Sequence, residues 1–429
     1  MADSEEDVTE PSSYPKAIVA LAGGRDRYQL PLALHEGGLL QKLITEMYWP
    51  AEKEWFTSFL APLLGQHRIG TRYCPGLTSD KVEISKSALC AFGSMKVTSL
   101  LNLTRMKDRA LSRKARQIAL REGAALFCYS YYAFDAFKSD GENPKHRFLF
   151  QLHPHPKTVR QLLLAEAERV PSASWSLKME HELSLPAEDF EKLSSEPHLA
   201  NGWVVASSYT SHTLSEHGIP EGQIHVVPYG VDGNTFAKRI LPPGPNKPFT
   251  VIYVGSIIQR KGLSYLLDGV RLLKSTNIRV LLCGRGVFDR HLVSQYSDLN
   301  VEIRLGLPEQ ELISKIHQSD IFALPSLTEG FAHVILEAMS CGLPILATPH
   351  TCAPDITTEG VHGFIVPIRN AEAIAEKLAW GLDHRSDLAT MGEAAAIQAR
   401  TFTWERFKEG IRKAYKEMIS SSAQYETSI

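Results

Sequence analysis

The most constraining feature of the sequence is a repeated alternation of short apolar runs with longer segments of helical periodicity. Such alternation is typical of parallel sheets, because each parallel strand needs a crossover helix to bring the chain back to the same edge. In the first half of the chain the apolar runs are KAIVALAGG, which starts at Lys16, and the segments 124–129, 148–152, 203–206 and 223–228. We therefore expect a doubly wound parallel sheet in this half.

A proline-rich segment separates this series from a second one. The sequence LPPGPNKP at residues 241–248 contains four prolines and a glycine, and such a segment continues neither a helix nor a central strand. Beyond it, the apolar runs TVIYVG, IRVLLCG, VEIRLG, IFALPS and PILAT again alternate with helical segments. The pattern predicts two Rossmann-like domains, at residues 15–240 and 249–400, joined by a linker at 241–248.

The two ends of the sequence carry further signals. Residues 1–14 are acidic and lack the positively charged and apolar regions of a secretory signal, which predicts a disordered acidic tail. Near the other end, Thr403 precedes a segment of helical period, as a helix-capping residue does. We expect residues 401–429 to form a helix, with a short tail, that packs back across the junction of the domains.

Composition narrows the function classes. A chain of 429 residues, of which 44% are hydrophobic, is typical of a globular protein with two cores. Its net charge of −2 provides no overall field for nucleic acid. The longest apolar stretch, 124–137, is shorter than the roughly 20 residues that a membrane span needs. The six cysteines lack metal-binding spacing, so we expect reduced thiols, a cytoplasmic location and no bound metal.

A loop with carboxylates is expected after the run IFALPS. In PSLTEGFAHVILEAMSCGLP the loop carries Glu329 and Gly330, and a helix is expected to begin near Phe331, with Glu337 inside it. Glycine lets the backbone approach a ligand closely, and the free amides at a helix N-terminus favour a phosphate. Two carboxylates in this position can accept hydrogen bonds from sugar and ribose hydroxyls. This loop therefore suits a nucleotide sugar.

A loop with adjacent cations is expected after the run TVIYVG. In VGSIIQRKG the strand is expected to end at Gly255, and Arg260 and Lys261 precede the next helix. The N-terminal end of a helix dipole is positive, so cations there are unfavourable unless an anion balances them. At the carboxyl edge of a parallel sheet they can balance a pyrophosphate and stabilise it as a leaving group. The two loops together predict a donor site.

These loops resemble the donor site of glycosyltransferase family 4. Its members carry a Glu-x7-Glu pair in the form EGFxxxxLEAM, followed by GxP, and a GxxxxxKG loop upstream. In this sequence the pair is Glu329 and Glu337, and the upstream loop runs from Gly255 to Gly262. The resemblance covers most of the C-terminal half. It implies a GT-B fold, in which two Rossmann-like domains face each other across a cleft.

The resemblance also implies an activity. Members of the family move a hexose from a nucleotide sugar, here expected to be a UDP- or GDP-sugar, to a hydroxyl of a glycan or glycolipid acceptor. Retaining members are thought to react on one face of the sugar, with the departing phosphate helping to remove the acceptor proton. No cofactor or metal is implied, because the nucleotide sugar is a substrate. A GT-B nucleotide-sugar epimerase or a phosphorylase-like enzyme remains the alternative.

Roles of individual residues follow from the resemblance. Glu329 is expected to contact the transferred sugar, Glu337 the ribose, and Lys261 the diphosphate. Because Ser256 stands where the family often has arginine, a second cation is expected from Arg260 or from elsewhere. The donor-binding residues expected on this basis are Gly23, Gly24, Gly255, Arg260, Lys261, Gly330, Phe331 and Glu337.

The first half resembles the family more loosely. Members commonly place a histidine just beyond a strand, near the reacting sugar, and in FLFQLHPHP the best positional match is His153, with His155 as its competitor. His153 and Glu329 are thus the expected catalytic residues. The pair Gly23-Gly24 after the first strand either contacts substrate or only turns the chain.

A basic stretch begins at Lys96 and ends at Arg121, with leucine and isoleucine interspersed. A basic amphipathic helix can bind anionic lipid as a peripheral membrane contact, which suits a lipid-linked acceptor. A solvated face on a packed helix has the same pattern, so both interpretations stay open.

Overall fold

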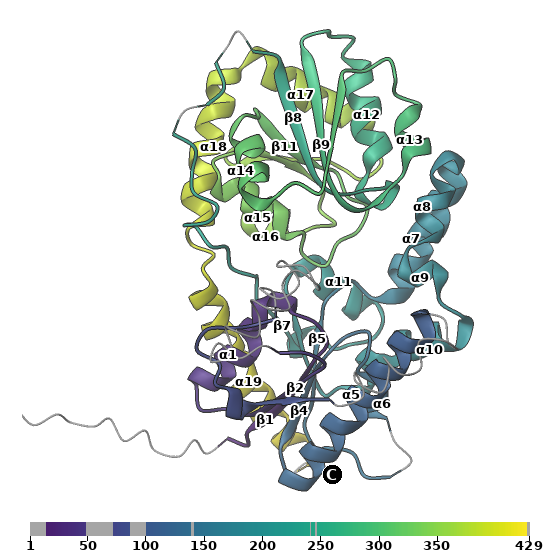
Figure 1. Ribbon diagram of the computed structural model, residues 1–429, viewed down its shortest axis with the longest axis vertical. Helices are drawn as coiled ribbons and strands as arrows, with labels where there is room; N and C mark the ends of the chain where they lie inside the picture. The colour runs from purple at the N-terminus through teal and green to yellow at the C-terminus, as the bar shows by residue number, and fades with distance from the viewer. Residues whose placement is uncertain are drawn as a thin grey trace, which may run out of the picture. The chain divides into compact units, whose positions relative to one another are not determined.

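The computed structural model describes residues 14–48, 72–85, 100–138, 141–240, 242–244 and 247–426. Of the expected acidic tail, only Tyr14 falls within this part of the chain. The basic stretch that starts at Lys96 also begins outside the described residues, which resume at Leu100. The described residues form two sheets with helices packed around them (Figure 1).

The first sheet has seven strands in the order β3-β2-β1-β4-β5-β6-β7. Strand β1 pairs in parallel with β2 on one side and with β4 on the other, and all of its residues are buried. The apolar pattern does not predict β2 and β3, because Gln41 and Lys42 interrupt β2 and β3 is only three residues long. The strands are β1 (Ala17–Leu21), β2 (Leu40–Thr45), β3 (Val82–Ile84), β4 (Ala125–Tyr129), β5 (Arg147–Gln151), β6 (Gly202–Val205) and β7 (Ile224–Val226).

Two helices of the first half begin at residues whose side chains act as caps. Helix α7 starts with Pro156 in its first turn and with the His155 ring accepting a hydrogen bond from the Lys157 amide, and both devices suit a helix N-terminus. The Ser207 hydroxyl caps α11 in the same way by accepting from the Thr210 amide. The helices are α1 (Gln29–Glu36), α5 (Leu100–Glu122), α6 (Phe134–Phe137), α7 (Pro156–Arg169), α8 (Ser174–Lys178), α9 (His181–Ser184), α10 (Ala187–Leu199) and α11 (Ser208–Glu216).

The second sheet has six strands in the order β10-β9-β8-β11-β12-β13, and every neighbouring pair is parallel. All five strands that the second series predicts are present, and β13 is additional. The strands are β8 (Phe249–Ile257), β9 (Ile278–Phe288), β10 (Val301–Leu305), β11 (Ile321–Leu324), β12 (Ile345–Ala347) and β13 (Gly363–Ile365). The helices are α12 (Leu263–Leu272), α13 (Arg290–Ser294), α14 (Glu309–His317), α15 (His333–Ser340), α16 (Ala353–Ile356), α17 (Ala371–Asp383) and α18 (Arg385–Ala399).

The chain divides into two compact units by contact. One unit contains Met1–Phe150, Ser195–Val204 and Lys408–Ile429, and the other contains Gln151–Ser194 and Val205–Phe407. Helices α7, α8, α9 and α11 lie in the first half of the sequence, yet they belong to the same unit as the second sheet. The domain boundaries at 240 and 249 therefore stay a prediction from the sequence pattern.

The last helix, α19 (Trp404–Glu426), begins at the expected cap. The Thr403 hydroxyl accepts a hydrogen bond of 3.1 Å from the Arg406 amide. Further along, within the first unit, the Tyr415 hydroxyl donates to the Pro15 carbonyl at 2.6 Å and Lys408 pairs with Glu36 at 2.7 Å. Among the described residues, no helix is long and apolar enough to cross a membrane.

Candidate active site

The two loops expected to bind the donor lie at the carboxyl edge of the second sheet. Strand β8 leads into the 3-10 helix η6 (Gln259–Lys261), and strand β11 leads into the loop that carries Glu329. These strands are parallel neighbours, with β9 and β10 on one side of them and β12 and β13 on the other. The strand order thus reverses between β8 and β11, and open parallel sheets bind ligands outside such a switch point.

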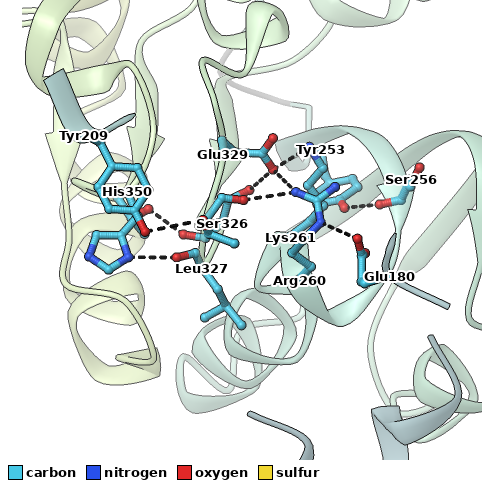
Figure 2. A network of polar contacts seen from close by, with 12 residues as sticks. Glu180, Tyr209, Tyr253, Ser256, Arg260, Lys261, Ser326, Leu327, Glu329 and His350 are labelled. Atoms are coloured by element: carbon cyan, nitrogen blue, oxygen red, sulfur yellow. Dashed lines mark hydrogen bonds and ion pairs between the residues drawn. The ribbon is translucent and has the colours of Figure 1, made fainter. Parts of the chain in front are cut away.

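Glu329 is the centre of a buried network of polar contacts (Figure 2). Only 6% of the residue is exposed. Its Oε1 atom lies 2.5 Å from Lys261 Nζ and 2.9 Å from Arg260 Nη1, and it accepts a hydrogen bond of 3.1 Å from the Ser326 hydroxyl. The structure therefore brings together a carboxylate and two cations that separate loops carry.

The charges of this network support one another. Burial alone would raise the pKa of Glu329, but Lys261 and Arg260 outweigh burial and lower the pKa to about 2. Glu329 is therefore an anion at neutral pH. Burial lowers the pKa of Lys261, and the Glu329 carboxylate opposes this effect. An unpaired buried charge is costly. A ligand can therefore replace one member of the Glu329–Lys261 pair, but removing that member without a replacement would leave the other charge buried and unpaired.

Arg260 joins three parts of the second unit. Its Nη1 atom donates to the Thr328 carbonyl at 3.0 Å as well as to Glu329, and its Nε atom forms an ion pair of 2.9 Å with Glu180. Glu180 directly precedes helix α9, far from both loops in the sequence. Burial raises the pKa of Glu180, and Arg260 opposes this effect. No motif surrounds Glu180, so the sequence gives no signal for its place in this network.

The loop that carries Glu329 is braced by the loop that follows β12. The Glu329 amide donates to the His350 carbonyl at 2.9 Å, and His350 Nδ1 lies 2.8 Å from the Leu327 carbonyl oxygen. The Tyr209 ring stacks on the His350 ring with centroids 4.4 Å apart. These contacts fix the backbone on both sides of Thr328 and therefore limit how far the Glu329 carboxylate can move.

Two glycines in the motifs are required by contacts within the protein. Gly262 has φ of +73°, and a Cβ atom there would lie 1.9 Å from the Pro325 carbonyl oxygen. A Cβ atom on Gly330 would lie 1.8 Å from the Leu152 carbonyl oxygen and 3.2 Å from the His153 Cα atom. Gly330 is expected to let the backbone approach a ligand, and its close packing against the backbone of Leu152 and His153 is a second reason for a glycine at this position.

The remaining residues of the second half that are expected to bind the donor lie in or next to these loops. A Cβ atom on Gly255 would lie 3.9 Å from Lys261 Cε. Phe331 is buried and packs edge-on against Tyr229, with ring centroids 5.2 Å apart. Helix α15 begins at His333, two residues later than expected, because Ala332 has φ of +70° and is not helical. Glu337 lies on α15 and is half-buried.

The two candidate histidines have different surroundings. His155 is fully buried, its ring caps α7, and it stacks on the His217 ring with centroids 3.8 Å apart. His153 is half-buried, its backbone packs against Gly330, and its charge contributes to lowering the pKa of Glu329. His155 thus has a structural task, whereas His153 lies within the electrostatic reach of Glu329.

Gly23 and Gly24 follow β1 in the first unit. Gly23 has φ of +84°, and its backbone lies close enough to Arg72 for a Cβ atom to fall 3.5 Å from Nη1. A positive φ accounts for a glycine in the turn. The role of the pair in substrate binding stays a prediction.

A second buried network supports the turn that presents Lys261. Glu166 on α7 is fully buried, and its Oε1 atom accepts hydrogen bonds of 2.8 Å from both Gln259 Nε2 and the Tyr265 hydroxyl. Its Oε2 atom pairs with Arg369 Nε at 2.7 Å. Gln259 Nε2 also donates to Ser264 at 2.7 Å. The sequence pattern does not reveal this network, because Glu166 lies in an ordinary helix of the first half.

Within the described part of the chain, no group of three or more histidine, cysteine, aspartate or glutamate residues is arranged to hold a metal ion. The spacing of His153 and His155 could alternatively suggest a pair of metal ligands, but no group of this kind among the residues described includes them.

Comparison with known proteins finds relatives of the second half of the chain. Residues 238–398 match the family described as glycosyl transferases group 1. WcaL of Salmonella typhimurium, a putative colanic acid biosynthesis glycosyltransferase, is 32% identical over 178 residues, which cover 39% of this chain and 44% of that protein. The matched part thus spans less than half the length of this curated relative.

Solved structures resemble nearly the whole chain. Sucrose-phosphate synthase from Thermosynechococcus elongatus has a TM-score of 0.64 at 16% identity, covering 95% of this chain and 99% of that chain. Anabaena HepE, solved with UDP-glucose, has a TM-score of 0.56 at 15% identity, and the match covers 94% of this chain and 100% of that chain. Likeness at this identity establishes the fold alone. The fold is GT-B, with two parallel-sheet Rossmann-like domains.

Proposed function

We propose that the protein is a retaining glycosyltransferase that moves a hexose from a UDP- or GDP-sugar to a hydroxyl of a glycan or glycolipid. The observation that carries the proposal is the 2.5 Å approach of Lys261 Nζ to Glu329 Oε1 at the switch point between β8 and β11. A cation beside a carboxylate suits a sugar diphosphate, because one end of that donor is anionic and the other presents hydroxyls. The family match and the name of the Salmonella relative support the same function.

Lys261 is assigned to the donor diphosphate. In the structure its charge is balanced by Glu329, and an arriving diphosphate exchanges one anionic partner for another. The first turn of α15 adds backbone amides, because Ala332, the residue before the helix, supplies no capping side chain and helix N-termini bind phosphate oxygens. These groups stabilise the negative charge that develops as the diphosphate leaves.

Glu329, Glu337 and His153 are assigned to the sugar and the ribose. Glu329 is a fixed anion that accepts hydrogen bonds from sugar hydroxyls and stabilises positive charge at the anomeric carbon. Glu337, on the same helix whose first turn meets the phosphate, accepts hydrogen bonds from the ribose hydroxyls. His153 is assigned to the reacting sugar because its backbone packs against Gly330, the neighbour of Glu329.

The proposed reaction proceeds on one face of the sugar. The bond from the anomeric carbon to the diphosphate oxygen breaks while the acceptor oxygen forms its bond on the same face, and a phosphate oxygen of the leaving group takes the acceptor proton. The protein orients both substrates and stabilises the developing charges. No protein nucleophile takes part, so retention follows from the geometry of attack.

A panel of nucleotide sugars, analysed by mass spectrometry, tests the proposal. The wild type is expected to release a nucleoside diphosphate from at least one UDP- or GDP-hexose, with faster release when an acceptor glycan is added. Glu329→Ala and Lys261→Ala are expected to abolish this release, and equal activity in both variants would refute the site assignment. Product stereochemistry and acceptor dependence separate transfer from an epimerase or phosphorylase-like reaction, which neither the matched family nor the Salmonella relative supports.

We also propose a cytoplasmic location with helix α5 as a peripheral membrane contact. The charge available for lipid is smaller than the sequence suggests, because Lys114 pairs with Glu83 at 2.8 Å and Arg113 with Asp135 at 3.6 Å. Co-sedimentation with vesicles containing phosphatidylserine tests the contact. Charge reversal at Arg113, Lys114 and Arg116 is expected to abolish sedimentation, and a wild type that stays in the supernatant would end this part of the proposal.

A further inference from the structure

The Arg260 side chain makes its polar contacts with oxygen atoms of the protein. Its Nη1 atom donates to the Thr328 carbonyl at 3.0 Å and to Glu329 Oε1 at 2.9 Å, while its Nε atom faces Glu180 Oε2 at 2.9 Å (Figure 2). Its own carbonyl accepts a hydrogen bond of 2.9 Å from the Leu327 amide. The Thr328 carbonyl and the carboxylates of Glu329 and Glu180 are thus all held by one arginine side chain, of which 18% is exposed.

Lys261 is held quite differently. Among the described residues its ammonium group pairs with Glu329 alone, at 2.5 Å. An ammonium group has three donors on a flexible stem, so Lys261 can turn to a new anion without breaking other contacts. Adjacent residues therefore present one cation that is fixed and one that can exchange its partner.

The charges of the four side chains add to zero, with Glu180 and Glu329 opposite Arg260 and Lys261. If both cations moved to a diphosphate, Glu329 would be left buried without a positive partner, which costs several kcal/mol. If only Lys261 moves, Arg260 still neutralises Glu329 and still holds it between Thr328 and Glu180. The contacts thus favour a division of tasks between the two cations.

We propose that Arg260 and Glu180 are positioning residues that fix the Glu329 carboxylate for the transferred sugar, while Lys261 binds the diphosphate. This inference rests on the proposed function. It assigns a role to Glu180, a residue of the segment Gln151–Ser194 that belongs to no sequence motif. It also replaces the expectation that Arg260 is the second cation for the diphosphate.

The charge-conserving substitution Arg260→Lys separates the two roles. Lysine keeps the positive charge but cannot hold Glu180, Thr328 and Glu329 together. Binding of UDP and GDP is measured by calorimetry, and turnover by release of the nucleoside diphosphate from saturating UDP-glucose or GDP-mannose. The positioning role predicts that kcat falls about tenfold or more while the Kd of the nucleotide changes by less than about threefold. A larger change in Kd than in kcat would overturn the proposal.

Lys261→Met provides the reference for loss of a diphosphate ligand, with a Kd raised about tenfold or more. A second pair of variants covers the case in which Arg260→Lys folds poorly. Glu180→Gln removes the carboxylate that faces Arg260, and Glu182→Gln removes a neighbouring buried carboxylate whose charge also reaches Arg260. Both variants remove one negative charge near Arg260, but only Glu180 contacts it, so the difference between them reports the contact. Glu180→Gln is expected to lower kcat more than Glu182→Gln does, with similar Kd values for both, and equal kcat values would overturn the role of Glu180.

Failure of the proposed function and failure of the positioning role give different experimental results. A wild type that binds neither UDP nor GDP and consumes neither donor contradicts the proposed function itself. A wild type that binds and consumes a donor, with Arg260→Lys impaired mainly in nucleotide binding, contradicts the positioning role alone.

Discussion

Glu166 on helix α7 accepts a hydrogen bond of 2.8 Å from Gln259, the residue that opens the turn presenting Lys261. Glu166 comes from the first half of the sequence, yet it is fully buried among side chains of the second unit. The cation loop is therefore supported by a segment that no donor-site motif includes. The stability of the fold and the position of Lys261 should consequently depend on the same buried carboxylate.

Glu166→Ala is expected to destabilise the protein by about 3 to 5 kcal/mol, because it leaves the half-buried Arg369 charge and the donors of Gln259 and Tyr265 without their shared partner. The double variant, in which Arg369→Ala is added, should lose much less unfolding free energy than the sum of the losses in the two single variants, since the charges are coupled. Urea unfolding of the single and double variants measures this. The exposed pair Arg271–Asp298, at 2.5 Å, is the control and should couple by less than about 1 kcal/mol. Additive effects at Glu166 and Arg369 would show that they do not act as a pair.

Gly262→Ala is expected to disrupt the junction of the two donor loops. Gly262 has φ of +73°, and a Cβ atom would lie 1.9 Å from the Pro325 carbonyl oxygen. Gly360 has nearly the same φ, +75°, but open space around it. Gly360→Ala should therefore lower the free energy of unfolding by about 1 kcal/mol through backbone strain alone. Gly262→Ala should lower it by about 1 to 3 kcal/mol more because of the clash. Urea unfolding compares them, and equal losses would mean that the loop relaxes freely.

The two histidines should separate stability from turnover. His155→Ala removes the cap of α7 and a buried ring, so the free energy of unfolding should fall by about 1 to 3 kcal/mol. His153→Ala should change stability by less than about 0.5 kcal/mol but lower donor turnover by about tenfold or more. Thermal melting and nucleoside diphosphate release measure the two effects. Turnover lost in His155→Ala but kept in a stable His153→Ala would reverse the assignment.

Glu196 provides a test of the first unit by pH. This residue is 2% exposed, and its carboxylate accepts hydrogen bonds from the amides of Tyr131 at 2.7 Å and Phe134 at 3.2 Å. Burial raises its pKa from 4.5 to about 8, despite those amides. The folded protein therefore keeps a proton that the unfolded chain releases between these pH values, so this group reduces stability progressively as the pH rises from 4.5 to 8.

Glu196→Gln removes this titration. Relative to the variant, the wild type should lose up to about 5 kcal/mol of unfolding free energy between pH 4.5 and pH 8, since each pKa unit corresponds to about 1.4 kcal/mol. Urea unfolding at several pH values measures the difference. A difference that does not depend on pH would mean that Glu196 is ionised in the folded protein at all of them.

Much of the fold follows from the apolar pattern. Strands β8 to β12 and β4 to β7 coincide with apolar runs, and helix α14 begins and ends where its periodicity does. The pattern misses some short strands and strands that contain polar residues. Strand β13 has three residues, and Lys42 and Gln41 lie inside β2. Such strands form because their neighbours in the sheet pair with them, which is a property of the tertiary structure and not of the segment.

The same distinction holds for the site. Glu329 and Lys261 can be paired from the sequence because their loops follow strands that become neighbours in a doubly wound sheet. The acids that meet the cation loop from elsewhere, Glu180 and Glu166, carry no local signal, because their burial depends on how residues 151–194 pack on the second unit. The start of α15 is also missed, since Ala332 has a positive φ, which alanine rarely adopts and no sequence pattern signals.

Equilibrium binding of UDP and GDP to the wild type and to Lys261→Met tests the central claim most directly. Lys377→Met, at a surface lysine whose side chain is 30% exposed, is the control for loss of one positive charge. We predict that one of the nucleotides binds the wild type and Lys377→Met alike, and binds Lys261→Met about tenfold more weakly or worse. Equal affinity of the wild type and Lys261→Met for that nucleotide would contradict the account.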